Sequence, residues 1–289
     1  EGGGYNPLVV NIEELYDQFA WGIAKHPLAI RNFASYAIEI WDETPTYLFL
    51  LGKSIVYTTA NENVSEERYN KCLVPTFGQT PSDMMLSTQG NDTYRGRLAT
   101  GRVSANNPDE VRAYLDKVQE YEAQLNNPSC NKADRLWFKD ALHIAGGTSL
   151  SEANSFMSTL DVYKQTYEAR AFGGNVLYTY NKLTEEVIET ADLDGFINNG
   201  LADINFVGHG STGTGFNVDL ESPANYTNFG KYPLIIAGSC FVGDVHTYSD
   251  NVSMAEEFTL IDNLGAIGFL ATTSLGFPTY LEVYASNLY

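Results

Sequence analysis

The sequence predicts an α/β fold in which mostly parallel sheets are flanked by helices. Apolar runs of strand length alternate with segments of helical periodicity along the chain. Most of these runs are continuous, which is typical of strands that are covered on both faces, as in parallel sheets. With 289 residues, 44% of them hydrophobic, the chain can bury a sizeable core, either as one large domain or as two halves.

The expected strands are apolar runs that end at turn residues: 47–52, 72–77, 98–103, 141–146, 175–180, 204–208, 234–238 and 266–272. Between them lie the expected helices: 12–24, 27–41, 108–124, 151–169, 184–198 and 253–263. The third helix has a complete start signal, because Asn107 can cap it, Pro108 fits its first turn and two acids follow. This alternation predicts right-handed βαβ units with functional side chains at the carboxyl ends of the strands.

A polar stretch at residues 126–131 is the best internal boundary. We expect residues 1–127 to form an amino-terminal subdomain and residues 128–289 to form a second subdomain that carries the candidate catalytic residues. The chain has no internal repeat and no low-complexity segment that would suggest another division.

The chain is strongly acidic, with 17 basic and 36 acidic side chains and a formal net charge of −19. This charge repels phosphate backbones and anionic membrane surfaces, so nucleic acid is not an expected partner. A cationic peptide or a basic protein surface would be attracted, although solubility alone also explains the acidity. No run approaches the roughly 20 apolar residues that a membrane-spanning helix needs, so direct membrane insertion is not expected.

The three cysteines, Cys72, Cys130 and Cys240, exclude a full disulfide framework and leave at least one free thiol. Cys72 and Cys130 have no motif around them, whereas Cys240 follows an apolar run. With four histidines and no His-Glu-x-x-His pattern, the sequence does not indicate a zinc site. His143 lies inside an apolar run, which indicates a core histidine, and the position of His246 indicates an exposed loop.

Two apolar runs end in a glycine that is followed by a reactive side chain. Residues 204–208 are followed by His209, and residues 234–238 are followed by Ser239 and Cys240. The segment between the two runs is long enough for a crossover that joins parallel strands. Because sequential strands are often neighbours, about 4.8 Å apart, we expect His209 and Cys240 to emerge side by side at one edge of a sheet.

This pair has the chemistry of cysteine acyl transfer. A thiol with a reference pKa of about 8.5 needs a neighbouring base near neutral pH, and His209 can take its proton and return it to a leaving amine. Gly208 and Gly210 would allow a sharp turn and a close approach of substrate, and the amides of Gly210 and Cys240 are candidates for the oxyanion hole. Alone, each residue would be explained as a tight strand end or an inert buried cysteine; their matched contexts favour a catalytic dyad.

Residues 208–211, Gly-His-Gly-Ser, and residues 239–244, Ser-Cys-Phe-Val-Gly-Asp, resemble the gingipain family of cysteine peptidases. Further motifs that resemble this family follow the same order along the chain: 90–94, 100–104, 121–122 and 266–273. The resemblance implies a caspase-like fold of two side-by-side α/β subdomains, with His209 and Cys240 as the catalytic dyad.

The opening segment, residues 10–31, is more similar to the sortase-like peptidases of the bacterial type IX secretion system than to secreted gingipains. This implies a processing peptidase of Bacteroidetes that acts on secreted proteins outside the cytoplasm, at the cell surface, at the outer membrane or in the periplasm. Peptide or protein substrates and other components of the secretion system are the implied partners.

Two positions depart from the pattern of this family. Arginine-specific gingipains carry a glutamate at the position of Ala145, so the residue that would orient His209 is missing or is supplied from elsewhere. Residues 148–152 are shorter than the loop that gives those enzymes an acidic primary pocket, so trypsin-like specificity is not expected. Glu152 is an acid nearby, which the pattern explains as an exposed residue in the first turn of a helix.

The resemblance requires no cofactor but raises the question of calcium, which gingipain-like peptidases bind. Asp83, Asn91 and Asp92 stand in the matching loop and offer the oxygen ligands that a hard cation prefers. The spacing of an EF-hand is absent, and turn formation explains the Gly-Asn-Asp sequence equally well.

Two functions follow from these observations. A cysteine endopeptidase would use Cys240 as nucleophile and His209 as base and then acid, with the thioester resolved by water or, in a transpeptidase, by an amine. A catalytically inactive gingipain-like domain would instead serve as a protein-binding component of the secretion machinery, as Ala145 and the short loop suggest. A caspase-like peptidase outside the gingipains would share the dyad but not the motifs of residues 90–122.

Overall fold

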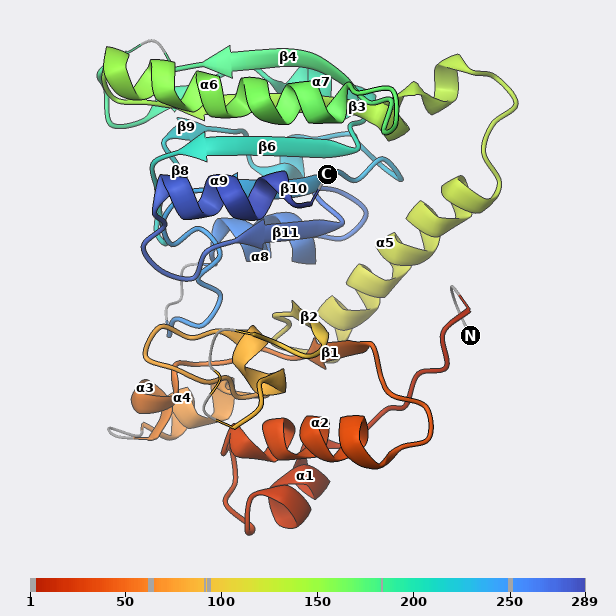
Figure 1. The fold of residues 1–289 in the computed structure, drawn as a ribbon, viewed down its shortest axis with the longest axis vertical. Helices are drawn as coiled ribbons and strands as arrows, with labels where there is room; N and C mark the ends of the chain where they lie inside the picture. The colour runs from red at the N-terminus through yellow and green to blue at the C-terminus, as the bar shows by residue number, and fades with distance from the viewer. Residues whose placement is uncertain are drawn as a thin grey trace. The chain divides into compact units, whose positions relative to one another are not determined.

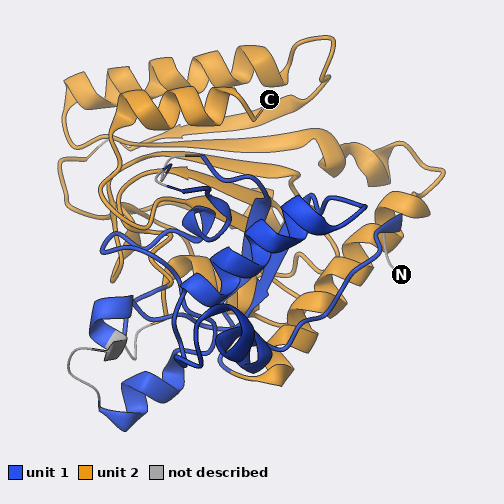
Figure 2. Ribbon diagram, turned by 60° about the horizontal axis from the view of Figure 1, so that its bottom comes forward, with its two compact units in different colours: residues 1–106, 246–248 blue, residues 107–245, 249–289 orange. Residues whose placement is uncertain are grey.

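The computed structural model describes residues 4–61, 65–90, 92, 95–182, 184–248 and 252–288. The chain forms two compact units, which Figure 2 colours separately. Unit 1 comprises residues 1–106 and 246–248, and unit 2 comprises residues 107–245 and 249–289. Both contain parallel strands and helices, as the sequence predicts.

Unit 1 is built on two parallel strands, β1 (Tyr47–Leu51) and β2 (Ala99–Val103). Its helices, in chain order, are α1 (Ile12–Phe19), α2 (Leu28–Ile40), α3 (Tyr57–Asn61), α4 (Glu66–Lys71) and the 3-10 helix η2 (Asp83–Ser87). The core of this unit comprises Leu15, Tyr16, Ala20, Ala29, Ile30, Leu50 and Leu86. α1, α2 and η2 therefore cover the face of β1 from which Leu50 projects.

Residues 72–77 do not form the expected strand. The amides of Leu73 and Val74 both donate to the carbonyl of Lys53, and Phe77 makes an isolated bridge with Ser82. Two consecutive amides that converge on one carbonyl cannot belong to a ladder, in which bonds of successive residues point to alternate sides. The preceding α4, which was not expected, is capped by Ser65, whose side chain accepts from the amide of Arg68.

Unit 2 contains a fully parallel sheet in the order β11-β10-β6-β3-β4 (Figure 1). Its strands are β3 (Asp140–Gly146), β4 (Asn175–Asn181), β6 (Asp203–Gly208), β10 (Leu234–Gly238) and β11 (Gly268–Ala271). The helices are α5 (Pro108–Asn126), α6 (Leu150–Tyr167), α7 (Asp194–Asn199), α8 (Met254–Leu260), α9 (Pro278–Ser286) and the 3-10 helices η3 (Ala133–Lys139) and η4 (Pro223–Asn225). Two short pairs complete the unit: β5 (Glu189–Thr190) with β9 (Val218–Asp219), and β7 (Gly210–Ser211) with β8 (Gly215–Phe216).

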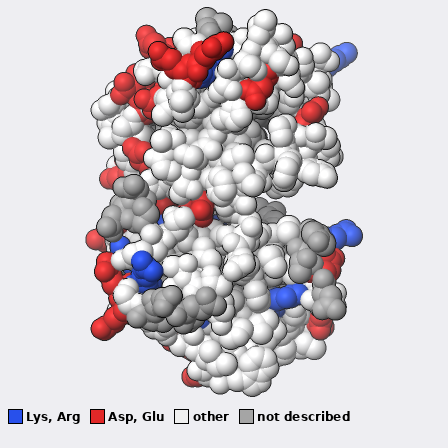
Figure 3. All heavy atoms as spheres, turned by 90° about the vertical axis from the view of Figure 1, so that its left-hand side faces the viewer, with Lys and Arg blue, Asp and Glu red and all other residues white. Residues whose placement is uncertain are grey.

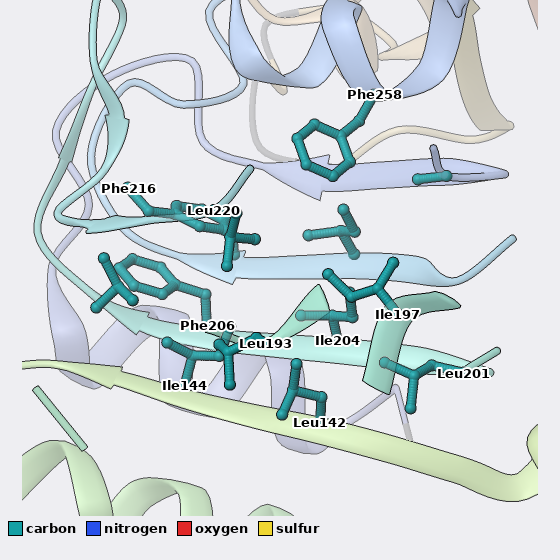
Figure 4. Close-up of a cluster of buried hydrophobic side chains, with 14 of the residues drawn as sticks. Leu142, Ile144, Leu193, Ile197, Leu201, Ile204, Phe206, Phe216, Leu220 and Phe258 are labelled. Carbon is teal, nitrogen blue, oxygen red and sulfur yellow. The ribbon is translucent and has the colours of Figure 1, made fainter. Parts of the chain in front are cut away.

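Alternate residues of the central strands project to opposite faces of this sheet. On one face, Figure 4 shows side chains of neighbouring strands packing together with those of α7 and α8: Leu142, Ile144, Ile204, Phe206, Ile197 and Phe258. On the other face, side chains of the strands pack on α6 and α9: Ala145, Val207, Ile236, Phe156, Leu160 and Ala285. Both faces are covered, which explains why the runs of these strands are continuously apolar.

The helix expected at residues 184–198 is wrong for most of its length. Residues 189 and 190 form β5, and only residues from Asp194 onward are helical, as α7. The ammonium group of Lys182 donates to the carbonyls of Thr184 (2.6 Å) and Glu186 (2.5 Å). These carbonyls are oriented toward a side chain, so they are not aligned along a helix axis as a helical start would require.

α5 belongs to unit 2, although from the sequence it was expected before the subdomain boundary. The ammonium group of its Lys117 donates to the carbonyls of Leu264 and Ala266, both at 3.1 Å, and of Phe258 at 3.4 Å. These bonds join α5 to α8 and to the segment before β11. The compact units therefore divide between residues 106 and 107 rather than between residues 127 and 128.

Candidate active site

Two adjacent strands bring His209 and Cys240 to one edge of the sheet in unit 2. β6 and β10 are direct parallel neighbours, with Val207 opposite Gly238. The pairing of these two strands ends two residues before His209 and Cys240. Parallel neighbours lie about 4.8 Å apart, so the expected adjacency of the two strand ends is confirmed.

The imidazole of His209 packs against the first turns of α6. Its Nε2 atom lies 3.2 Å from Oε2 of Glu152, and the two side chains are 50% and 39% exposed, respectively. The ring of Phe156 meets the imidazole edge-on, with the ring centroids 6.1 Å apart. Glu152 and Phe156 are four residues apart, so they project from the same face of α6.

Glu152 is held in place by the segment that leads into its helix. Its Oε2 atom accepts from the hydroxyl of Thr148 at 2.6 Å and from the amide of Thr148 at 3.0 Å. The side chain of Ser149 caps α6 by accepting from the amide of Glu152. The two hydrogen bonds from Thr148, with a smaller contribution from His209, lower the pKa of Glu152 to about 2, so the carboxylate is ionised at neutral pH.

The sulfur of Cys240 contacts the backbone of a segment that follows β11. The amide of Gly276 donates to Sγ at 3.3 Å, and the thiol lies 3.7 Å from the carbonyl oxygen of the same residue. Gly276 was not among the candidate residues expected from the sequence. No local signal points to it, because its contact with Cys240 spans 36 positions.

The loop after Cys240 is tied to that same segment, residues 272–276. The amide of Phe241 donates to the carbonyl of Ser274 at 2.9 Å, and the amide of Gly243 donates to the carbonyl of Thr272 at 3.0 Å. Phe241 has a φ of 59°, a left-handed conformation that costs a non-glycine residue strain. The surrounding hydrogen bonds therefore fix a strained turn directly after Cys240.

The glycines of the His209 turn are needed for packing within the chain. A Cβ at Gly210 would lie 2.6 Å from Val242 and 2.9 Å from the hydroxyl of Ser239. A Cβ at Gly208 would lie 2.7 Å from the Cα of Gly146, its partner in β3. Neither glycine has the positive φ that a sharp left-handed turn would require. Close approach of the strand ends, rather than turn conformation, thus explains these residues.

In the expected calcium site, the carboxylate of Asp83 is engaged by an arginine. Both carboxylate oxygens of Asp83 accept from Arg102, Oδ2 from Nε at 2.7 Å and Oδ1 from Nη2 at 2.8 Å. Oδ1 of Asp92 accepts from the amide of Arg95 at 3.2 Å, and Asn91 lies outside the described residues. Among the residues that the structure describes, no group of three His, Cys, Asp or Glu side chains could hold a metal ion.

The other histidines and cysteines named in the sequence analysis differ in their burial. His246 is buried in unit 1, where its Nδ1 atom contacts the hydroxyl of Ser54, so the expected exposed loop is wrong. His143 is fully buried in β3, and burial lowers its pKa to about 4. Cys72 is buried and Cys130 is exposed, and all three cysteines are free.

A parallel sheet covered by helices on both faces, with a histidine and a cysteine following two adjacent strands, defines the class of α/β proteins with a caspase-like fold. The chain belongs to peptidase family C25, whose family model matches residues 1–289. A comparison with curated proteins finds no match.

Three solved structures share the fold. One described as the structure of a protease has a TM-score of 0.67 at 21% identity, covering 88% of this chain and 52% of its own. The crystal structure of the Arg-specific cysteine proteinase gingipain R (RgpB) has a TM-score of 0.64 at 17% identity. The match covers 95% of this chain and 60% of that protein. The complex of the RgpB pro- and mature domains from Porphyromonas gingivalis has a TM-score of 0.65 at 17% identity. The match covers 94% of this chain and 62% of the matched chain.

The chain therefore spans between about half and three-fifths of the length of these proteins. Within the described part of the chain, none of the helices combines the length and apolar character needed to cross a bilayer.

Proposed function

We propose that this chain is the catalytic region of a cysteine endopeptidase, with Cys240 as nucleophile and His209 as general base and acid. The observation that carries this proposal is the direct parallel pairing of β6 with β10, whose ends lead into His209 and Cys240. Membership of peptidase family C25 supports the same reaction class.

In the first step the imidazole of His209 takes the thiol proton, and the sulfur of Cys240 attacks the peptide carbonyl carbon. The electron pair of the C=O bond moves to the oxygen, and we assign the amides of Gly210 and Cys240 as donors to this oxyanion. When the carbonyl re-forms, the C–N bond breaks, and His209 gives its proton to the leaving amine. The acyl group remains on Cys240 as a thioester.

Attack on the thioester by water would make the protein a hydrolase, and attack by an amine would make it a transpeptidase. The amino-terminal similarity to sortase-like peptidases favours a role in processing secreted proteins outside the bacterial cytoplasm, within type IX secretion. Protein substrates and other secretion-system components are the partners that belong to this proposal.

The experiment is labelling with a peptidyl acyloxymethyl ketone, which alkylates a reactive thiol, followed by mass spectrometry. Cys240 should be modified in the wild type and should lose most of its labelling in His209→Ala. Cys130→Ala is the matched control, because Cys130 is likewise a free cysteine and is exposed, and its removal should leave the labelling of Cys240 unchanged.

Cleavage of a diverse peptide library, with Cys240→Ala as control, then identifies the bonds that are cut. An added amine nucleophile separates the two outcomes, since only a transpeptidase yields the amide product. If Cys240 stays unlabelled under reducing conditions, with and without calcium, the peptidase proposal fails and the protein-binding domain is the better description.

A further inference from the structure

We propose that Glu152 is the positioning residue of His209, taking over from the first turn of α6 the role that the sequence leaves unfilled at Ala145. This inference rests on the proposed function of the dyad. It assigns a role to a side chain that the sequence pattern explains only as an exposed helix-start residue.

The position of Ala145 cannot supply the missing acid. Ala145 is fully buried in β3 and packs with Phe156 and Leu160 of α6 and with Val207 of β6. A carboxylate at this point of the core would have to be desolvated among apolar side chains. The acid that actually reaches the imidazole is Glu152, whose helix begins four residues after the end of β3.

The contact is made by a carboxylate that is already fixed. All three groups that approach Oε2 of Glu152 come from two residues: the hydroxyl and the amide of Thr148 and Nε2 of His209. The hydrogen bonds from Thr148 orient the oxygen without using the imidazole, so the carboxylate keeps its place when the ring changes protonation state. This is the preorganisation that a positioning residue requires.

A purely structural role for Glu152 explains less of this geometry. In a capping box the third residue of the helix bonds back to the amide of the capping residue. Glu256 in α8 does this with Ser253. In α6 the equivalent Glu152 instead accepts from Thr148, one residue earlier, and its Oε2 is thereby set 3.2 Å from the imidazole.

The contact fixes the chemistry of the ring. With Nε2 donating to Glu152, Nδ1 is the nitrogen that remains for proton exchange with Cys240. The carboxylate also stabilises the imidazolium that forms when the thiol is deprotonated. The titratable group that contacts the imidazole is Glu152 from α6, and Phe156 contributes an apolar ring. Cys240 follows β10, the strand that pairs with β6.

The test compares wild type with Glu152→Gln, which keeps the shape and an acceptor oxygen but removes the charge. The ring of His209 is titrated by NMR, with its signal assigned from a His209→Asn variant. In Glu152→Gln we expect the midpoint to move to lower pH, because the imidazolium loses its partner. On a substrate found in the library, we expect kcat/KM to fall about 10- to 100-fold, less than for the buried aspartate of a serine triad because this pair is half-exposed.

Glu110→Gln is the matched control, because Glu110 also stands in the first turn of a capped helix of unit 2. The Glu110→Gln variant should have the same His209 midpoint and the same pH–rate profile as wild type. Thr148→Val, which removes one donor but no charge, should lower kcat/KM with little movement of the midpoint.

The limb of the pH–rate profile that reports loss of the imidazolium proton should move with the NMR midpoint. If Glu152→Gln leaves the NMR midpoint unchanged, the positioning role is overturned, whatever the activity. If the midpoint moves but wild type cleaves no peptide and Cys240 is not labelled, the contact is real and the proposed peptidase function is what fails.

Discussion

The ammonium group of Lys117 lies where three backbone carbonyls converge, those of Phe258, Leu264 and Ala266. The side chain is fully buried, and burial lowers its pKa to about 7, with Asp262 acting in the opposite direction. A neutral lysine can still donate two hydrogens, so two of these three hydrogen bonds can persist without the charge. The cost of burying the charge should therefore depend on pH.

This cost should appear as a pH dependence of the free energy of unfolding. Between pH 7 and the ordinary lysine pKa of about 10.4, the unfolded chain holds a proton that the folded chain has lost, so the contribution of Lys117 to stability is lowest below pH 7 and rises with pH. We expect the difference in unfolding free energy, wild type minus Lys117→Met, to increase from pH 6 to pH 9 by at most about 1.4 kcal/mol per pH unit. Urea denaturation followed by circular dichroism measures it.

The matched control for this prediction is Lys164→Met, since Lys164 is partly exposed in α6 beside Glu168. Its difference from wild type should stay constant over the same pH range. If the difference in unfolding free energy between wild type and Lys117→Met is also constant, Lys117 keeps its proton over the whole pH range.

Gly276 is the second residue whose role can be tested directly. A Cβ at this position would lie 2.6 Å from Cδ1 of Leu281 and 2.9 Å from the carbonyl oxygen of Ser239. Gly276→Ala should therefore push its amide away from the sulfur of Cys240, and we expect alkylation of the thiol to slow by about tenfold, with a loss of about 1–3 kcal/mol in stability. Labelling rates and urea denaturation measure the two effects.

Gly213→Ala is the control for this change, because a Cβ at Gly213 would meet no other atom within 4 Å and the variant should label like wild type. Equal labelling rates for Gly276→Ala and wild type would show that the amide of Gly276 does not set the reactivity of the thiol.

At the scale of single residues, the sequence predicts those site residues that a local sequence pattern identifies. His209 and Cys240 each follow an apolar run that ends in glycine, and such a strand end can be recognised without knowledge of the fold. The contact between Glu152 and His209 joins positions 57 residues apart, and no spacing rule connects them. The local part of the arrangement is different, since Thr148 and Ser149 before Glu152 form a recognisable helix start.

At the scale of elements, the 3-10 helix η2 is fastened to β2 by a bidentate ion pair. Burial of the carboxyl group opposes its ionisation, but the charge and hydrogen bonds of Arg102 outweigh burial and hold the pKa of Asp83 at about 2. The side chains of Arg102 and Asp83 are 4% and 17% exposed. Arg102 also donates to the carbonyls of Gly52 and Val74, so one guanidinium group joins four segments of unit 1.

Asp83→Asn should therefore destabilise unit 1 by about 3 kcal/mol, because it leaves the buried guanidinium without its counter-charge. Because the pKa of Asp83 is lowered, its contribution is present above about pH 4 and is lost as the pH falls toward 2. Asp109→Asn is the matched control, since Asp109 and Arg112 form a pair of similar length that is 92% and 71% exposed, and its loss should cost less than about 1 kcal/mol. Equal effects of the two substitutions in thermal unfolding would contradict the importance assigned to the buried pair.

Elements are predictable where a single physical cause dominates. The central strands of unit 2, β3, β6 and β10, are largely buried, so their apolar runs give their positions almost to the residue. Residues 184–198 also have apolar residues at helical spacing, but Lys182 captures two of their carbonyls and β9 pairs with Glu189. Such tertiary competition is not encoded in the segment itself.

At the scale of the whole molecule, the order of the strands in the sheet does not follow from the sequence of this chain alone. It depends on how the elements pack, or it is inferred from related proteins. Chain order would suggest that β4 lies between β3 and β6, whereas β3 and β6 are direct neighbours and β4 is at the edge. The resemblance to gingipains captured the architecture because it depends on an ordered set of motifs. The sequence does not indicate that α5 belongs to unit 2, because Lys117, whose buried ammonium group joins this helix to that unit, looks like a surface lysine in sequence.

The net charge of −19 leads to a prediction about substrates. Figure 3 views the side toward which β4 and β6 run, and acidic side chains are scattered there among larger uncharged areas. A field of this sign should attract cationic peptides and raise their encounter rate at low salt. We expect kcat/KM for a cleaved peptide flanked by lysines, several residues from the scissile bond, to fall several-fold as ionic strength rises from about 0.05 to about 0.5 M, because the Debye length shrinks from about 14 to about 4 Å. The same peptide flanked by glutamates should show the opposite trend, and the two rates should converge at high salt. Identical salt profiles for both peptides would leave solubility as the whole explanation of the acidity.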